Sequence, residues 1–126
     1  MSFSNNAENL LLNWVLTANA ATRPTAWYVA LFTTDPTDAD TGTEVSGGSY
    51  ARTAVTFSVT GNAATNTGGV EFPAATANWG TVSHIGVYDA STAGNLIFHS
   101  PLTVAKAITD GDVFRIPTGD LDFTLD

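Results

Sequence analysis

The stretch EFPAATANWGTVSHIGVYDA, residues 71–90, decides the fold more than any other part of the chain. Its second half is rich in β-branched and aromatic residues and ends in Asp-Ala, with Ser91 next, which is typical of a strand followed by a turn. Side chains of a strand alternate between two faces, so His84 and Asp89 lie on opposite faces and cannot form a catalytic dyad within it. Val82 shares the face of His84 on this pattern. The stretch therefore predicts a structural strand, with core packing by Val82, Ile85, Val87 and Tyr88.

Strand-like segments recur on both sides of this stretch, separated by clusters of Gly, Pro, Asp and Ser. Even spacing of short strands is typical of an antiparallel sandwich rather than of alternating strands and helices. Residues 61–69, which are rich in Gly and Asn, predict a turn. We therefore predict a mainly β fold, an antiparallel, jelly-roll-like β-sandwich over residues 25–126. Its strands are expected at residues 25–34, 50–60, 70–72, 82–88, 96–99, 112–116 and 121–125.

One N-terminal α-helix is predicted at residues 4–20. Ser4 is a suitable N-cap, and the residue before a proline, Arg23, is driven out of helical geometry. Apolar residues at helical spacing form a surface wider than one stripe, which suggests contact with more than one neighbour. The centre of this surface is Leu11, Trp14 and Val15. A chain of 126 residues forms a single domain, 1–126, from this helix and the sandwich.

Composition excludes several classes of partner. The chain has 12 acidic and 4 basic residues, a net charge of −8, and such a surface repels nucleic acid phosphate and anionic lipid. We therefore predict no nucleic acid partner and no membrane partner. The absence of cysteine removes thiol catalysis and disulfides. The first residues have no basic region or cleavage site of a signal peptide, which predicts a soluble protein made in the cytoplasm.

No catalytic or metal-binding pattern stands out. His84 and His99 have no metal-ligand spacing, and we interpret both as structural. Nucleotide-binding glycine motifs and a Gly-x-Ser-x-Gly nucleophile elbow are both missing from the sequence. An acidic loop, residues 35–44, resembles an EF-hand only loosely, and we interpret it as a solvated loop while leaving calcium binding open. Its carboxylates are Asp35, Asp38, Asp40 and Glu44. No enzyme activity, cofactor or metal is predicted.

Several segments, taken in order along the chain, resemble small bacteriophage virion proteins described as tail fibre proteins or minor structural proteins. They are NNAENLLLNWVL, WYVALFTTDP, EVSGGSYARTAVTF, EFPAATANWGTVSHIGVYDA, GNLIFHSPLT and GDVFRIPTGDLDFTLD. The resemblance covers nearly the whole chain and implies a virion component, made in the host cytoplasm, with other phage structural proteins as partners. Such proteins are used in many copies, most often as homotrimers.

Three functions remain open at this point. The first is a tail fibre-associated or minor tail protein, in which Leu11, Trp14 and Val15 contact another subunit or the particle. Packing of this helix on its own sandwich is the alternative for those residues. The chain has no coiled-coil or collagen-like shaft, so a capsid decoration (cement) protein is the second function. A glycan-binding host-recognition module is the third, with Tyr50, Trp79 or residues 35–49 as contacts.

Overall fold

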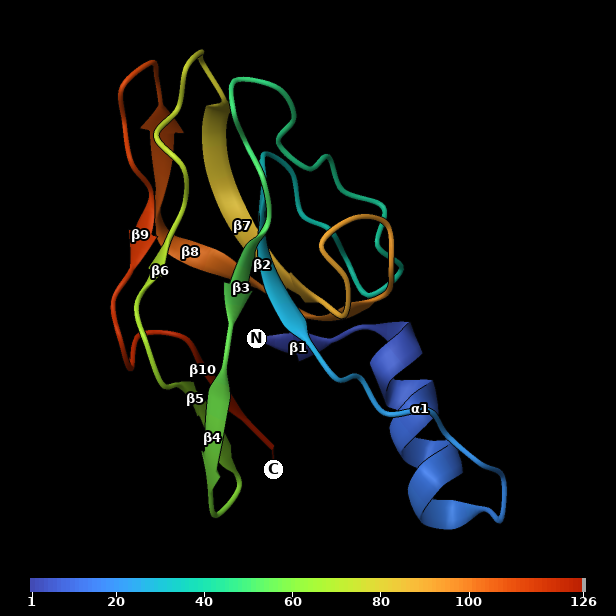
Figure 1. Cartoon of the computed structure of the whole chain (residues 1–126). Helices are drawn as coiled ribbons and strands as arrows, with labels where there is room; N and C mark the ends of the chain where they lie inside the picture. Colours follow the sequence, from blue (N-terminus) through green and yellow to red (C-terminus); the bar gives the residue numbers. More distant parts are fainter. Residues whose placement is uncertain (126) are drawn as a thin grey trace.

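The computed structural model describes residues 1–125 as one helix and ten short strands (Figure 1). Residue 126, the predicted end of the sandwich, lies outside the described residues. The elements, in chain order, are β1 (Ser2–Phe3), α1 (Asn5–Leu16), β2 (Trp27–Phe32), β3 (Thr53–Val55), β4 (Phe57–Thr60), β5 (Ala63–Asn66), β6 (Val70–Glu71), β7 (Gly80–Tyr88), β8 (Leu96–Ile108), β9 (Arg115–Ile116) and β10 (Asp122–Thr124).

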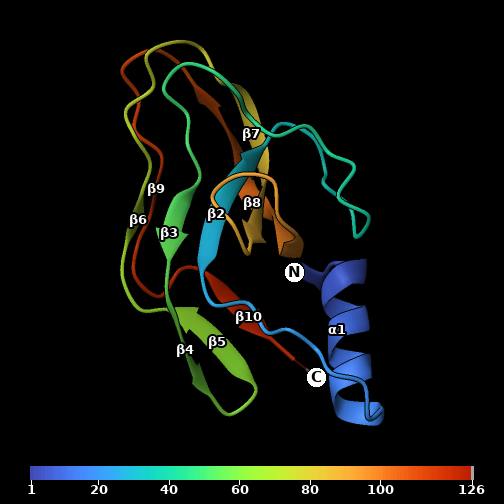
Figure 2. The ribbon, with the colours of Figure 1, turned by 45° about the vertical axis from the view of Figure 1, so that its right-hand side comes forward.

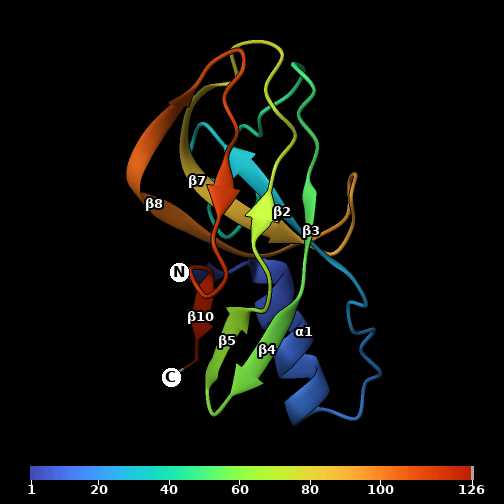
Figure 3. The same ribbon diagram turned by 60° about the vertical axis from the view of Figure 1, so that its left-hand side comes forward.

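The strands form antiparallel sheets in a sandwich-like arrangement, which confirms the predicted fold class. One sheet has the order β1-β8-β7-β2-β3, and two smaller sheets have the orders β10-β5-β4 and β6-β9. In Figure 3, β6 and β9 lie in front of β2 and β7, while β4, β5 and β10 continue the front layer downward. The chain passes from β3 directly into β4, so one extended segment links the large sheet to the small one.

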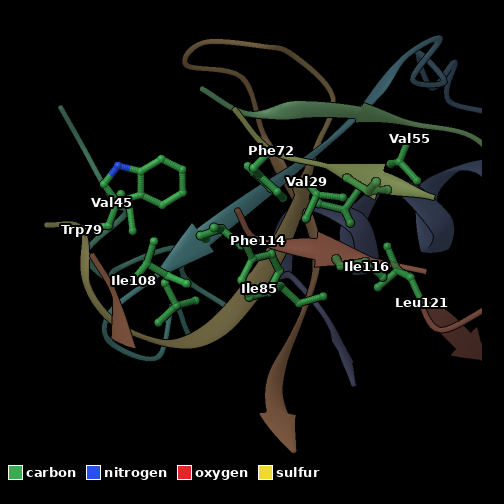
Figure 4. Packing of buried hydrophobic residues seen from close by; sticks show 14 of the residues in the cluster. Val29, Val45, Val55, Phe72, Trp79, Ile85, Ile108, Phe114, Ile116 and Leu121 are labelled. Atoms are coloured by element: carbon green, nitrogen blue, oxygen red, sulfur yellow. The ribbon is translucent and has the colours of Figure 1, made fainter. Parts of the chain in front are cut away.

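The main core fills the space between the large sheet and the layer facing it (Figure 4). Val29 and Ile85 reach into it from the large sheet, and Phe114, Ile116 and Leu121 reach into it from the opposite side. Burial of this kind is worth roughly 1.5–3 kcal/mol per large apolar side chain. The second face of the large sheet is also buried, by a smaller cluster of Ala30, Phe32, Tyr88 and Leu96.

The alternation predicted for β7 is interrupted near its start. Val82 pairs with Lys106 of β8, but His84 pairs with Pro101, so β8 has extra residues at this point. Such a bulge bends the strands and disturbs the alternation of side chains. Val82 therefore lies in the main core with Ile85 and not on the face of His84, as the sequence pattern predicted.

The predicted turn at residues 61–69 is wrong in its middle part, because residues 63–66 form strand β5. β5 pairs with β4 on one side and β10 on the other, and these long-range partners supply its hydrogen bonds. Only Gly61 and Asn62 form the hairpin loop, and Gly61 has φ +61°, which a glycine adopts without strain. The side-chain oxygen of buried Asn66 accepts from the backbone N–H groups of Gly119 and Leu121.

Strand β8 is longer than the predicted 96–99, so His99 lies inside the strand and not at its end. Proline removes a backbone donor and is tolerated where a strand has no neighbour on one side. β1 pairs with β8 only at Phe98 and His99, which leaves Pro101 at such an edge. The strand can therefore continue through the proline to Ile108.

Helix α1 is capped by Ser4, as predicted, but ends at Leu16 instead of residue 20. Thr17 is extended, with φ −132° and ψ 171°, and its hydroxyl donates to the carbonyl oxygen of Asn13 at 2.6 Å. This side-chain bond competes with continued helix, as threonine hydroxyls commonly do. Residues 17–26, the return segment, then run back to β2 without regular structure.

Candidate assembly surface

The first turn of α1 is fixed firmly to the sheet. The N–H of Ser4 donates to the carbonyl oxygen of Ile97 at 2.9 Å, and its hydroxyl donates to the carbonyl of Leu96. That hydroxyl also accepts the N–H of Ala7, at 3.1 Å, as the helix cap. The N–H of Asn5 donates to the carbonyl oxygen of Asp38, at 2.9 Å. The direction of the helix is therefore set at its N-terminal end, where Ser4 and Ala7 are buried.

The rest of α1 extends away from the large sheet, to the level of β4, β5 and β10, as Figure 2 shows. Residues four apart lie on the same row of a helix, so its apolar side chains occupy three adjacent rows. Ala7 is the one buried residue of the helix, and the apolar side chains of its last two turns are open to solvent. The exposed fractions are 57% for Leu12, 68% for Trp14, 65% for Val15 and 72% for Leu16.

One of the three rows is partly covered by the return segment. Leu10, Leu11 and Trp14 line a groove of about 260 Å³ together with Ala21, Arg23 and Pro24. Leu11 is therefore half-buried, while Trp14 and Val15 remain largely exposed. The predicted contact residues are Leu11, Trp14 and Val15. They lie on one helix, and the sandwich does not bury them. An exposed apolar patch of this kind is typical of a site that binds another protein.

A second apolar groove, which we call the hairpin groove, opens beside the β4–β5 hairpin. It has a volume of about 290 Å³ and lies between that hairpin, β10 and the start of the chain. Two of its lining side chains, Val59 and Leu125, are 72% and 46% exposed. Among the residues that the structure describes, its lining contains no ionisable side chain. The largest lining residues are Phe3, Trp27, Phe57, Phe98 and Phe123. Sequence reasoning missed this groove because it assigned residues 61–69 to a turn.

The acidic loop is tied to the sheet at its C-terminal end by Glu44, so it is not simply a solvated loop. Glu44 forms a two-point ion pair with Arg52, with Nε–Oε1 at 2.8 Å and Nη2–Oε2 at 2.9 Å. Nη1 of Arg52 donates to the carbonyl oxygens of Ala90 and Ala93, and its guanidinium lies 3.6 Å from the centroid of the Tyr88 ring. Burial acts to lower the pKa of Arg52, but hydrogen bonding and the charge of Glu44 outweigh it and raise that pKa.

Two tyrosine hydroxyls bind the same loop. Tyr50 donates to Oε1 of Glu44 at 2.8 Å and accepts the N–H of Leu31 at 3.0 Å. Tyr88 donates to Oδ1 of Asp40 at 2.5 Å. Burial raises the pKa of both tyrosines well above the ordinary value, and the nearby carboxylates raise it further. Each phenol therefore stays protonated and serves as a donor.

The two histidines, far apart in sequence, lie near the same part of the acidic loop. Nε2 of His99 lies 2.8 Å from Oδ1 of Asp38, and its Nδ1 lies 3.8 Å from Oδ1 of Asp35. Nε2 of His84 lies 3.9 Å from Oδ2 of Asp35, and its Nδ1 is bonded to the hydroxyl of Ser83. Asp89 instead accepts from Asn95 in the β7–β8 turn. His84 and Asp89 therefore bind different partners, and Asp89 lies just beyond the end of β7. The sequence did not pair the histidines with the loop.

The described residues do not assemble a metal site. No group of three or more His, Asp or Glu side chains in residues 1–125 is arranged to hold a metal ion. Asp35 and Asp38 of the acidic loop both lie near His99, while Asp40 binds Tyr88 and Glu44 binds Arg52. Within the same range, no helix is long and apolar enough to cross a membrane.

Trp79 and Tyr50, the predicted glycan contacts, lie together but not as an open platform. Trp79 is 5% exposed, and its indole N–H donates to the carbonyl oxygen of Gly48 at 2.9 Å. Its ring meets Tyr50 edge-on, with ring centroids 5.4 Å apart. A ring that stacks on a sugar needs an accessible face, and this indole is surrounded by protein. The position of these rings therefore lends no support to glycan contact.

The raised tyrosine pKa values predict a loss of stability in base. Above pH 10 the unfolded chain loses phenol protons that the folded protein keeps, so the free energy of unfolding falls. The expected slope is up to about 1.4 kcal/mol per pH unit for each tyrosine. Urea unfolding between pH 9 and 11.5 measures it. The Tyr50→Phe and Tyr88→Phe variants should each show a shallower slope, and a slope equal to that of the unmodified protein would contradict this origin.

Fold and surface together define a small, mainly β protein that carries an unburied apolar helix, a class suited to contact with other subunits. The family model described as Podophage GP4 fiber I protein gp80 matches residues 2–124, nearly the whole chain. The chain belongs to this family of phage fibre proteins, and it is therefore a component of the virion. This confirms the resemblance to phage tail fibre proteins. No curated protein matches the chain.

Proposed function

We propose that this protein is a non-enzymatic structural part of a podophage tail fibre and assembles on the particle as a symmetric homo-oligomer, a trimer. The apolar end of α1 is its contact surface. Membership of the fibre family supports the place in the tail. The observation that carries the assembly is the exposure of Leu12, Trp14, Val15 and Leu16 on one helix.

The anchoring of α1 strengthens this proposal. A helix that was merely frayed or loosely attached would expose apolar residues without any function. Here the cap residue Ser4 is buried and bonded on both its hydroxyl and its N–H, so the helix holds a fixed direction. A helix that already has a fixed direction loses less conformational entropy when a partner covers it.

Immunogold electron microscopy of intact phage distinguishes the tail from the head. We expect label at the tail fibres. Label spread over the head would instead indicate a capsid decoration protein, and heat release of the genome from particles lacking the protein would then be the decisive assay. If the label lies on the tail and the purified protein also binds a specific glycan, the protein would have a role in host recognition in addition to its structural role.

Substitution of Trp14 tests the role of the helix surface. We expect Trp14→Glu to weaken self-association by roughly 30-fold or more, because tryptophan at the centre of an interface commonly contributes 2 kcal/mol or more. Sedimentation equilibrium over a concentration series measures the change. The fold should be retained, since the side chain is 68% exposed. Val104→Glu is the matched control, because Val104 is 69% exposed on β8. Equal association constants for the two variants would rule out the helix as the contact.

A further inference from the structure

We propose that the occupant of the hairpin groove is the C-terminal half of α1 from a second copy of this chain, docked head to tail. This inference rests on the proposed self-assembly and names the surface that receives the helix. The groove and the end of the helix both expose apolar side chains among the described residues, Val59 and Leu125 at the groove and Leu12, Val15 and Leu16 on the helix.

Charge favours a second copy as the occupant. The chain carries a net charge of −8, so two copies repel each other over most approaches. Residues 9–16 of α1 have no ionisable side chain, and neither do the described residues that line the hairpin groove. Contact between these two surfaces therefore brings acidic copies together through uncharged side chains. A basic partner protein would instead be attracted to the acidic surface elsewhere.

The helix of a copy cannot easily fill its own groove. Its first turn is held by the bonds of Ser4 and Asn5 to residues 96–97 and to Asp38. Swinging the helix across would break these bonds and expose buried Ser4 and Ala7. The groove begins at Phe3 and Ile97, next to this anchor, so an incoming helix and the outgoing helix lie on one continuous face.

Exposed apolar side chains are present on both surfaces of the contact. A standard interface covers about 800 Å² on each partner. With on the order of 100 Å² each, four side chains supply roughly half of that area on the helix, and two supply roughly a quarter of it at the groove. They are Leu12, Trp14, Val15 and Leu16 on the helix and Val59 and Leu125 at the groove. Because the two surfaces differ, repetition of one contact builds a closed ring, such as the proposed trimer, when the rotation between copies closes, and an open filament when it does not.

Engineered thiols test the contact, because the chain has no cysteine of its own. Val15→Cys places a thiol on the helix, and Val59→Cys places one on the rim of the groove. We expect a mixture of the two variants, oxidised at micromolar concentration, to form covalent dimer about tenfold or more above the control mixture, because docking raises the local thiol concentration. The control pairs Val15→Cys with Val104→Cys, whose valine is 69% exposed outside both surfaces. Urea unfolding of the reduced variants checks that all three fold.

The outcomes separate this inference from the proposed function. Equal yields in the two mixtures would overturn docking in the groove. So would the highest yield from Val15→Cys alone, which would indicate helix-to-helix contact. If sedimentation still shows an oligomer that Trp14→Glu dissociates, self-assembly through α1 stands and only the groove is wrong. A protein that remains monomeric at high concentration, without the cross-link, overturns both.

Discussion

Replacement of Arg52 with leucine is expected to lower the free energy of unfolding by about 3 kcal/mol, because it leaves a partly buried carboxylate without its partner. The Arg52 side chain is 9% exposed and that of Glu44 is 25% exposed. The substitution also removes donors from the carbonyl oxygens of Ala90 and Ala93 and the cation from the ring of Tyr88. Urea unfolding followed by tryptophan fluorescence measures the change.

The effect is large because Arg52 connects three separate parts of the chain. Arg52 immediately precedes β3, and its side chain binds the end of the acidic loop at Glu44 and the turn between β7 and β8 at Ala90 and Ala93. Arg52→Lys should recover little, since an ammonium cannot make the two-point bond to Glu44 and also reach both carbonyls. Adding Glu44→Gln to Arg52→Leu should recover part of the loss, because the unpaired charge is then removed.

Arg115 provides the matched control. It pairs with Glu71 at 3.1 Å through one nitrogen, and the two side chains are 62% and 58% exposed. Solvated pairs of this kind contribute about 0–1 kcal/mol, so Arg115→Leu should change the free energy of unfolding by less than about 1 kcal/mol. Equal losses for the Arg52 and Arg115 variants would refute the special role of Arg52.

Local patterns were sufficient to predict much of this fold. Strand-like composition, alternating side chains and turn-forming residues predicted β2, β7 and the mainly β class. These signals depend on residues that are close together in the sequence. The N-cap at Ser4 was predicted for the same reason. The end of the helix was not, because the extended conformation of Thr17 and its bond to Asn13 are one choice among several that the sequence allows.

The features missed from sequence depend on residues far apart in the chain. Strand β5 has a turn-like composition and exists because β4 and β10 pair with it. His99 contacts Asp38, which is 61 positions away in the sequence, and no local sequence pattern predicts that contact. The apolar surface of α1 was predicted, but the sequence left open whether that surface contacts another subunit or packs on its own sandwich. Whether a sheet covers a helix is decided by where the chain places both elements, and here the anchor at Ser4 points the helix outward.

Trp79→Ala is the second substitution with a large expected effect, a loss of about 3–5 kcal/mol in the free energy of unfolding. Trp79 lies in the main core at 5% exposure, and its truncation leaves a cavity beside Tyr50. Trp14→Ala is the control of the same residue type, and at 68% exposure it should change stability by less than about 0.5 kcal/mol. Similar losses at both positions would contradict the burial of Trp79.

This expectation also decides how glycan binding must be tested. Loss of binding in Trp79→Ala would report a destabilised protein as readily as a lost contact, so that variant cannot identify a sugar site. Trp79→Phe is the better probe, because it keeps an aromatic ring and should cost only about 1–2 kcal/mol, from lost volume and the bond to Gly48. The carbonyl of Gly48 still accepts the N–H of Thr76 in that variant. If the unmodified protein binds a glycan and folded Trp79→Phe binds it equally well, the indole is a core residue and the sugar site lies elsewhere. If folded Trp79→Phe loses binding, the indole contacts sugar after all and the loop above it must open.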